Sequence, residues 1–321
     1  MFNIQKILEK YYSKGDTIIL ACSTWPDSMF LLYKILETEF KKNLVVCYFN
    51  HKTRPETDEE EIFIEDLWKK EWFKVEVAEC DFEKIQKLYP SKSFEELARE
   101  KRYAFFNAVS NIYNSKYIIT GHHLDDKIET FFFNLTRGSK LTGLINMTEE
   151  SGWILRPLLG IQKSEITQYL DSNRLKYKID STNKDTDITR NYLRHEIIPK
   201  FEKVNTSYKQ NISKTLDYFE DLKNFIDIEV KKFLSPPPSP LPSKEGEKER
   251  SFNIEGFHSL SPFLQKEVIR YIYYTSNDKS TIWLSEANIT EVIKFINWKN
   301  NKTIKEIRNM KMEKDNKIIK Y

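Results

Sequence analysis

Glycine is scarce in this sequence. Only 8 of the 321 residues are glycine, about a third of the share usual in globular proteins. Five of the eight fall between residues 121 and 160. Because glycine allows tight turns and a close approach of the backbone to a ligand, we expect that stretch to be the first candidate for a binding site.

The sequence is also poor in cysteine and has no long apolar run. Its three cysteines, Cys22, Cys47 and Cys80, form no CxxC pair and no spacing typical of metal ligands. This excludes a disulfide framework and indicates a reducing compartment. No stretch approaches the roughly 18 uninterrupted apolar residues that would span a membrane, and residues 1–16 lack the pattern of a signal peptide. We therefore expect a cytoplasmic protein.

A large excess of one charge is absent as well. Lys and Arg number 51 and Asp and Glu 48, which gives a formal charge of +3. Any nucleic-acid partner must therefore meet local basic patches rather than a basic protein body. Hydrophobic residues make up 40% of the chain and aromatic residues 14%, which excludes a disordered chain. The length of 321 residues suits about two domains.

Short apolar runs alternate with amphipathic patterns in the first half of the sequence. The apolar runs predict strands over residues 17–22, 43–49, 74–77 and 116–120. The amphipathic patterns predict helices over residues 28–40, 58–72, 94–114 and 124–136. Such alternation predicts an α/β fold, a parallel sheet with helices on both faces. Because ligands bind beyond the carboxyl ends of such strands, we expect the site in loops 23–28, 50–56 and 121–126.

The composition changes after residue 205. Residues 205–233 show a strongly charged helical pattern, and residues 235–250 combine five prolines with a cluster of charges, which is typical of a linker or a disordered insertion. We predict a catalytic domain over 1–205, a helical connector over 206–234, the linker or insertion over 235–250 and a small C-terminal domain over 251–321.

Seven basic residues recur near the C-terminal end: Lys302, Lys305, Arg308, Lys311, Lys314, Lys317 and Lys320. They fit either a solvated hairpin or a surface that contacts a phosphate backbone.

The loop after the first predicted strand reads Ser23-Thr24-Trp25-Pro26-Asp27-Ser28. Its hydroxyl groups and the free N–H groups of the following helix would suit a phosphate, and Asp27 would hold Mg²⁺ against it. Ordinary capping of the helix by Asp27 or Ser28 explains the same residues.

The segment Gly121-His122-His123-Leu124-Asp125-Asp126-Lys127-Ile128-Glu129 is more specific. Asp126 and Glu129, three apart, share a face of the predicted helix, as do Asp125 and Glu129, four apart. Their carboxylates suit a divalent cation or a cationic substrate, and the two histidines suit a metal or a phosphate. An acidic first turn favoured by the helix dipole explains the carboxylates but not the histidine pair.

Arginine is used sparingly, as 11 of the 51 basic residues. Six of the eleven lie near the candidate segments: Arg99, Arg102, Arg137, Arg156, Arg190 and Arg194. Because a guanidinium makes a rigid two-pronged contact with phosphate or carboxylate, we expect some of them to bind substrate. Pairing with the nearby Glu95, Glu96 and Glu100 is the alternative.

Six motifs in order resemble the tRNA(Ile)-lysidine synthetase family, a branch of the PP-loop, or N-type, ATP pyrophosphatases. They lie at residues 50–56, 96–103, 121–138, 156–159, 180–183 and 190–194. The resemblance extends over residues 16–205, and the stretch 121–138 is its most specific part. It implies the PP-loop ATPase fold, which is similar to that of the adenine nucleotide alpha hydrolases.

The resemblance also implies a reaction. In that family, ATP adenylates the 2-carbonyl oxygen of the wobble cytidine of a CAU-anticodon tRNA(Ile), and pyrophosphate is released. The ε-amine of free lysine then displaces AMP and forms lysidine. The implied cofactors are therefore ATP and Mg²⁺, and the implied partners are the CAU-anticodon tRNA(Ile) and L-lysine, with no membrane. A homodimer is left open.

Particular residues receive roles from the same resemblance. The catalytic residues would be Arg102, Asp126, Glu129 and Arg194. ATP and pyrophosphate would contact Ser23, Thr24, Trp25, Pro26, Asp27, Ser28 and His122. The tRNA or another substrate would contact Asn50, His51, Arg54, Arg99, Arg137, Arg190 and Asn191. Mg²⁺ would be bound by Asp27 and Asp126.

One motif departs from the family pattern. The family's loop reads S-G-G-x-D-S, whereas this chain has Thr24 and Trp25 in place of both glycines. Because glycine permits positive φ around phosphates and β-branched or bulky residues resist it, we expect weaker handling of pyrophosphate. Two alternatives follow: a catalytically impaired tRNA-binding relic, and another PP-loop tRNA-modifying enzyme such as a thiolase.

Overall fold

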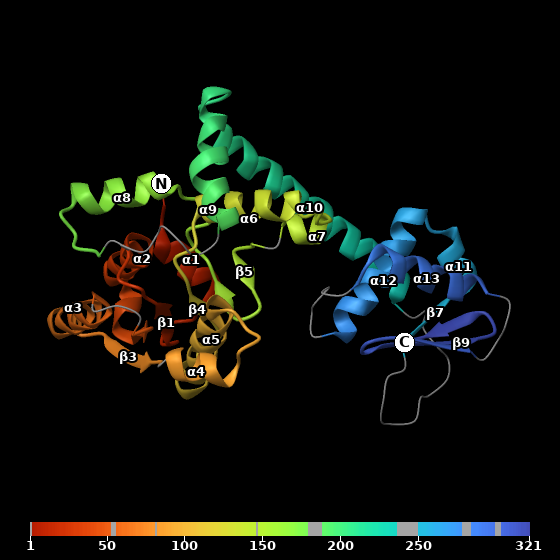
Figure 1. Cartoon of the computed structure of the whole chain (residues 1–321), viewed down its shortest axis with the longest axis horizontal. Coiled ribbons are helices and arrows are strands. Elements are labelled where there is room, and N and C mark those ends of the chain that lie inside the picture. The colour runs from red at the N-terminus through yellow and green to blue at the C-terminus, as the bar shows by residue number, and fades with distance from the viewer. Residues whose placement is uncertain are drawn as a thin grey trace. The chain divides into compact units, whose positions relative to one another are not determined.

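A mostly parallel sheet forms the centre of the N-terminal part of the computed structural model (Figure 1). Its strands are β1 (Ile18–Ala21), β2 (Leu44–Asn50), β3 (Lys74–Glu79), β4 (Ile118–Ile119), β5 (Glu150–Ser151) and β6 (Ile154–Leu155). They lie in the order β3-β2-β1-β4-β6-β5, and β5 alone among them runs antiparallel to its neighbour. β1 lies between β2 and β4, so Ile19 has Val45 on one side and Ile118 on the other. The predicted α/β fold is confirmed.

The structure describes residues 2–52, 56–80, 82–145, 147–178, 188–235, 250–277, 284–298 and 303–321. The chain divides into two compact units, Met1–Asp217 and Tyr218–Tyr321. Arg54 and the motif at 180–183 lie outside the described residues, as do residues 236–249 of the predicted linker. No helix of the described ranges is both long enough and apolar enough to cross a membrane.

Helices pack on both faces of the parallel sheet. The helices of this part of the chain are α1 (Ile4–Tyr11), α2 (Pro26–Leu36), α3 (Glu56–Glu71), α4 (Phe82–Leu88), α5 (Phe94–Ile112), α6 (Leu124–Thr136), α7 (Leu141–Leu144), α8 (Lys163–Ser172) and α9 (Ile188–Tyr192). Successive side chains of a strand point to opposite faces. Ile18 and Leu20 therefore join one core with α1, α2, α3 and α8, whereas Ile19 joins another with Phe106 and Val109 of α5.

Two predicted elements differ from the structure. The helix predicted over 28–40 is α2, which begins at Pro26 and ends at Leu36, and the 3₁₀ helix η1 (Glu39–Asn43) follows it. The earlier start suits Pro26, because proline has a helical φ and its missing N–H is not needed in the first turn. The strand predicted over 116–120 is reduced to the two residues of β4, because the ladder with β1 ends at Ile119.

The C-terminal unit contains a four-stranded antiparallel sheet in the order β7-β10-β9-β8. Its elements are β7 (Ser251–Asn253), α11 (Ile254–Ser259), α12 (Pro262–Ser276), α13 (Glu286–Asn297), β8 (Thr303–Ile307), β9 (Met310–Asp315) and β10 (Ile318–Lys320). The region predicted as a connector is largely one helix, α10 (Tyr208–Leu234), which begins in the first unit and ends in the second.

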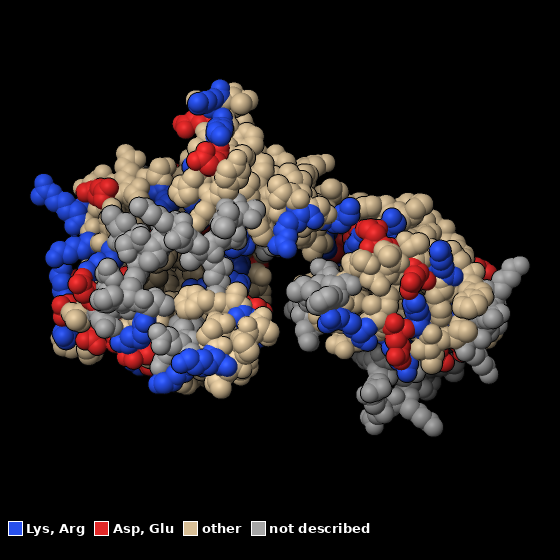
Figure 2. All heavy atoms as spheres, viewed as in Figure 1, with Lys and Arg blue, Asp and Glu red and all other residues tan. Residues whose placement is uncertain are grey.

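Four of the C-terminal lysines have polar or charged partners in the structure. Lys314 is buried, and its Nζ donates to the carbonyl oxygens of Ile296, at 2.8 Å, and Trp298. Lys305, Lys311 and Lys317 pair with Glu291, Glu306 and Glu255. On the face shown in Figure 2, basic and acidic side chains of this unit lie intermingled. Lys302 lies outside the described residues.

Candidate active site

The loop after β1 has a backbone conformation that is unusual for its residues. Thr24 has a φ of +65°, in the left-handed region that β-branched residues rarely enter. Thr24 is fully buried, its hydroxyl donates to the carbonyl of Ser23 at 2.5 Å, and its carbonyl accepts the N–H of Lys178 at 2.9 Å. Trp25 is extended, with a φ of −78°. Thr24 therefore adopts the positive φ that a β-branched residue disfavours, whereas the position of Trp25 does not require glycine.

Ser28 holds this loop against the start of α2. Its hydroxyl accepts the N–H of Ser23 at 3.1 Å and donates to the carbonyl of Trp25 at 3.1 Å. Trp25 is the N-cap of α2 but provides no side-chain acceptor. Because the N–H groups of a first helical turn have no acceptor within the helix, they suit an anion such as phosphate, together with the positive end of the helix dipole.

Gly121 brings the second candidate segment onto this loop. It follows β4, and a Cβ at this position would lie 3.0 Å from the backbone nitrogen of Ser28 and 3.1 Å from the carbonyl carbon of Asp27. Any side chain here would therefore require the first turn of α2 to shift. The two segments singled out in the sequence meet at the carboxyl edge of the sheet, where a doubly wound fold binds its ligands.

His123 lies between the carboxylates of the two segments. Its Nε2 is 3.5 Å from Asp27 Oδ1, and its Nδ1 is 3.5 Å from Asp126 Oδ2 and 3.8 Å from Asp125 Oδ2. Burial lowers the pKa of His123, but the three carboxylates outweigh burial and raise it above its usual value. Burial raises the pKa of Asp27, but His123 and Lys163 outweigh burial there and hold that pKa below its usual value.

The same geometry bears on the predicted Mg²⁺ ligands. Asp27 Oδ1 is buried without a hydrogen bond, and a carboxylate oxygen of this kind suits a hard cation. Asp126 lies at the opposite nitrogen of the His123 ring, and its Oδ2 accepts the N–H of His123 at 3.0 Å as a helix cap. Within the described ranges, no three His, Cys, Asp or Glu side chains surround one ion position. Asp27 therefore fits a Mg²⁺ ligand, whereas the His123 ring separates Asp126 from it.

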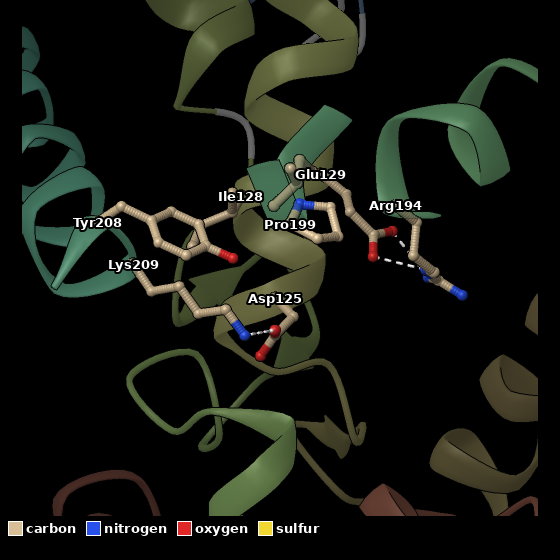
Figure 3. Close-up of a pocket in the computed structure, with 8 residues that line it drawn as sticks. Asp125, Ile128, Glu129, Arg194, Pro199, Tyr208 and Lys209 are labelled. Atoms are coloured by element: carbon tan, nitrogen blue, oxygen red, sulfur yellow. Dashed lines mark hydrogen bonds and ion pairs between the residues drawn. The ribbon is translucent and has the colours of Figure 1, made fainter. Parts of the chain in front are cut away.

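Glu129 and Arg194 form a two-pronged ion pair (Figure 3). Arg194 Nε donates to Glu129 Oε1 at 2.6 Å, and Arg194 Nη2 donates to Glu129 Oε2 at 2.7 Å. The same Nη2 is 3.7 Å from Asp126 Oδ1. Arg194 lies in the π-helical turn η2 (Leu193–Ile197), and its hydrogen bonds to Glu129 raise its pKa. Three of the four predicted catalytic residues are thus neighbours.

A second ion pair lies on the same pocket. Lys209 Nζ of α10 contacts Asp125 Oδ1, and Asp125 Oδ2 accepts the backbone N–H of Lys163 at 2.9 Å. Figure 3 shows the two pairs, Asp125–Lys209 and Glu129–Arg194, extending from successive turns of α6. The pocket is lined by Asp125, Ile128, Glu129, Arg194, Ile198, Pro199, Tyr208 and Lys209.

Sequence reasoning missed Lys163 and Lys209. Lys163 Nζ lies 3.6 Å from Asp27 Oδ2, and Lys209 pairs with Asp125. Neither lysine is part of a motif, and the chain is rich in lysine. Nothing in the sequence therefore indicated that these two lie at the site. Only their contacts with Asp27 and Asp125 distinguish them from surface lysines.

His122 has different surroundings from His123. Its Nδ1 lies 2.9 Å from Thr120 Oγ1. Burial lowers the pKa of His122 to about 4, and the positive charges of Arg156, Arg102 and Arg99 lower it as well, against the carboxylate of Asp126. His122 is therefore neutral near pH 7. Arg102, the fourth predicted catalytic residue, lies among these arginines on α5 rather than in the pair of Glu129 and Arg194.

Asn50 and His51 follow β2. Asn50 is buried, its Nδ2 donates to Glu61 Oε2 at 2.7 Å, and its Oδ1 accepts the N–H of Lys52 at 2.9 Å. The His51 ring packs edge-on against Phe49, with the ring centroids 4.9 Å apart. These contacts shape the loop, and contact with substrate stays a prediction.

Arg137 and Arg190 meet at one aromatic ring. Their guanidinium carbons lie 5.0 Å and 4.8 Å from the ring centroid of Phe133. Arg137 ends α6, whereas Arg190 and Asn191 lie on α9. Both arginines are exposed, so they can meet a large substrate, and the predicted contact with tRNA is not tested by this placement.

Comparison with known proteins first defines the class. Residues 2–201 match the family model of the PP-loop domain. Among solved structures, the U34-tRNA thiolase NcsA from Methanococcus maripaludis, with its [4Fe-4S] cluster, aligns with a TM-score of 0.55 and 17% identity over 68% of this chain and 76% of its own. At that identity the likeness shows the fold alone. The fold and the match over residues 2–201 are those of the PP-loop class.

Curated relatives narrow the class further. The tRNA(Ile)-lysidine synthase of Chlorobaculum tepidum is 30% identical over 82% of this chain and 78% of its own length. That of Bacillus thuringiensis subsp. konkukian is 31% identical over 87% of this chain. The chain therefore belongs to the tRNA(Ile)-lysidine synthase family of PP-loop proteins. It spans about 60% of the length of the Bacillus relatives that it matches.

Proposed function

We propose that this chain uses ATP to ligate lysine to the wobble cytidine of a CAU-anticodon tRNA(Ile), and that it forms lysidine through an adenylated tRNA. The name of its relatives, tRNA(Ile)-lysidine synthase, supports the substrate and the product. Three free, buried cysteines agree with a cytoplasmic setting. The observation that carries the proposal is the pocket on α6.

This pocket matches an amino acid because it carries charges of both signs. Each of its carboxylates pairs with one of its cations, Glu129 with Arg194 and Asp125 with Lys209. A substrate with an ammonium and a carboxylate group can break such a pair, because its ammonium group binds the protein's carboxylate and its carboxylate binds the protein's cation. We assign the α-carboxylate of lysine to Arg194, a guanidinium fork, and its α-ammonium group to Glu129.

In the first step the cytidine O2 attacks the α-phosphorus of ATP, and pyrophosphate leaves. Ser23, Ser28 and the first-turn N–H groups of α2 bind the pyrophosphate. Asp27 would hold Mg²⁺, which when bound would supply positive charge for the leaving phosphates. Lys163, 3.6 Å from Asp27, adds positive charge at the same edge of the sheet.

In the second step the ε-amine of lysine attacks C2 of the adenylated cytidine, and the C2–O bond breaks as AMP leaves. The attacking amine must give up a proton. In this assignment Glu129 binds the α-ammonium group of lysine, whereas Asp126 Oδ1 is 3.7 Å from Arg194, beyond hydrogen-bond distance. We therefore assign Asp126 as the proton acceptor, and Glu129 and Arg194 as groups that orient lysine.

The tRNA is proposed to contact exposed side chains around this edge of the sheet. Arg137 and Arg190 on Phe133, with Asn191 beside them on α9, provide a cationic and aromatic surface. Such a surface suits a phosphate backbone and unstacked bases. His51, which directly follows β2, and Arg54, three residues further along the sequence, are also proposed to contact the tRNA.

The decisive experiment supplies the full chain with labelled lysine, ATP, Mg²⁺ and a CAU-anticodon tRNA(Ile) transcript. We expect label in the tRNA, none without ATP, and none with uridine at the wobble position. A curated relative is run in parallel. If the relative labels the tRNA and this chain does not, the proposed function is wrong.

The two alternatives have less support. The thiolase neighbour shares the fold only, and Cys22, Cys47 and Cys80 are buried, with exposed fractions of 4%, 0% and 7%. The argument for a relic came from the missing glycines, and it is weakened because Thr24 adopts the left-handed conformation that a glycine would supply.

A further inference from the structure

Three arginines near His122 have no acidic partner among the residues that the structure describes. Arg99 and Arg102 lie three residues apart on α5 and so share a helix face, and Arg156 directly follows β6. Within the described part of the chain, none of the three forms an ion pair with a carboxylate. Among the described residues, the one hydrogen bond of their guanidinium groups is from Arg156 Nη1, which donates to the carbonyl of Thr148 at 3.1 Å.

Burial makes the lack of a carboxylate partner unfavourable, most of all for Arg156. Arg156 is only 8% exposed, and its Nε is buried without a hydrogen bond. Arg102 is partly buried, and Arg99 is exposed, with its guanidinium 4.6 Å from the ring centroid of Tyr103. A buried charge without a partner is strongly unfavourable. Burial lowers the pKa of both Arg102 and Arg156, and the positive charge of Arg99 lowers it further, against the effect of Tyr103.

Arg194 differs from the arginines near His122, because it has a carboxylate partner. Arg194 is held by both oxygens of Glu129, so carboxylates are available at this edge of the sheet. The arginines near His122 lie instead beside a neutral imidazole, and Arg99 lies over the ring of Tyr103, which contacts the ring of Trp153 with the centroids 5.7 Å apart. A site with several guanidinium donors, aromatic walls and no acid suits an anion with several oxygen atoms.

We propose that Arg156, with Arg102 and Arg99, forms a second anion site, separate from the loop after β1, that binds a phosphate group of ATP or of the tRNA backbone. Arg156 is the buried anchor of this site, and Arg99 lies at its exposed side. The proposal rests on the proposed function, because that function supplies both phosphate-bearing substrates.

The test compares Arg156→Met with the parent in the full-length chain. One arm measures the Kd of ATP by calorimetry without RNA, and the other measures the Kd of the tRNA transcript without ATP. We expect one of the two Kd values to rise about 10- to 100-fold, since a hydrogen bond to a charged group contributes roughly 1.5–3 kcal/mol. The arm that responds identifies the source of the phosphate. Arg174→Gln removes an exposed arginine as a charge-matched control and should change neither Kd.

Stability separates this role from a merely structural one. Because Arg156→Met removes an unpaired buried charge, its unfolding midpoint should equal or exceed that of the parent. If the variant does not fold, Arg156→Lys retains the charge but loses the fork, and we expect about 10-fold weaker binding in the same arm.

Three results would overturn the proposal: both Kd values unchanged in a folded variant, a change confined to the KM of lysine, or a parent that binds neither ATP nor tRNA. If the parent binds both but incorporates no lysine, while Arg156→Met weakens one Kd, the anion site stands and the proposed function fails.

Discussion

His122 and His123 are adjacent in the sequence, yet they lie in opposite electrostatic surroundings. His123 is buried among Asp27, Asp125 and Asp126, which raise its pKa. The pKa of His122 is lowered to about 4 by burial and by nearby arginines. Because successive side chains of an extended segment point to opposite sides, a single peptide bond places the two rings in different parts of the site.

The difference suggests how the site divides its work. The acidic side, around His123, contains Asp27 for a cation and lies next to the pocket with Glu129 and Arg194 for an amino acid. The basic side, around His122, contains the unpaired arginines and suits phosphate. The proposed reaction, which joins a cationic amino acid to a polyanionic RNA, would use both environments, and the charge of Asp126 acts on both histidines.

The largest effect is expected from Asp126→Asn, which removes a negative charge that raises the pKa of both histidines. The kcat of lysine incorporation should fall about 10²- to 10⁴-fold, because a general base is lost, whereas the amide oxygen can still cap α6. Steady-state kinetics measures the change, and Asp66→Asn, at an exposed surface pair, is the control. A kcat equal to that of the parent would remove Asp126 from the mechanism.

Gly121→Ala should disturb both sides at once, because residue 121 precedes both histidines and touches the first turn of α2. We expect a loss of about 1–3 kcal/mol in the free energy of unfolding, as for other overpacked positions, together with weaker ATP binding. Urea denaturation and calorimetry measure the two. Gly160→Ala is the matched control, since a Cβ at residue 160 meets no atom within 4 Å. Equal effects of the two substitutions would contradict the close approach of Gly121 to α2.

The pH dependence of stability should distinguish the two histidines by sign. In the unfolded chain His122 takes up a proton near its ordinary pKa of 6.5, whereas in the fold it stays neutral down to about 4. Its contribution therefore destabilises the fold increasingly as the pH falls from 6.5 towards 4. His122→Asn should remove that loss, a gain over the parent of up to about 2 kcal/mol at pH 5, at 1.36 kcal/mol per pH unit.

His123→Asn should show the opposite trend. The raised pKa of His123 makes its contribution stabilising below the unfolded pKa of 6.5, and that contribution is lost as the pH rises through the folded value. The variant should therefore lose most relative to the parent at low pH. Urea denaturation at pH 5 and pH 8 without Mg²⁺ tests both variants, and the same sign for both would refute the contrast.

The smallest effect is expected from Thr24→Gly in the loop that supports Asp27. Release of a left-handed threonine gains about 1–2 kcal/mol, but the substitution loses the buried side chain and its hydrogen bond to Ser23. We expect a net change below about 1 kcal/mol in the free energy of unfolding and an unchanged Kd of ATP. A tenfold gain in ATP affinity would restore the original expectation that the missing glycines weaken this loop.

Much of the fold follows from patterns in the sequence. The helix predicted over 124–136 is α6, because its apolar positions recur with the helical period. The convergence of loops 23–28 and 121–126 could be predicted because parallel strands end at one edge of a sheet. The short β4 and the early start of α2 could not, since strand length depends on the neighbouring strands and the start of a helix depends on local capping.

Which charged residues pair with one another could not be predicted from the sequence. Nothing in the spacing indicates that Arg194 holds both oxygens of Glu129, or that Lys209, from a helix assigned to the connector, pairs with Asp125. Lys314 shows the same limit in the other unit, because its regular spacing suggested a basic surface while the fold buries it against two carbonyl groups.

The sequence by itself determined the class of fold, the edge of the sheet where the site lies and the residue types that the site contains, because periodicity and motif order are local properties of the chain. The tertiary structure alone decided which charges are neutralised and which are not. That depends on distances between side chains far apart in the sequence and on which side of the chain each residue faces. For this reason the adjacent His122 and His123 lie among charges of opposite sign. For the same reason the arginines near His122 have no acidic partner among the described residues.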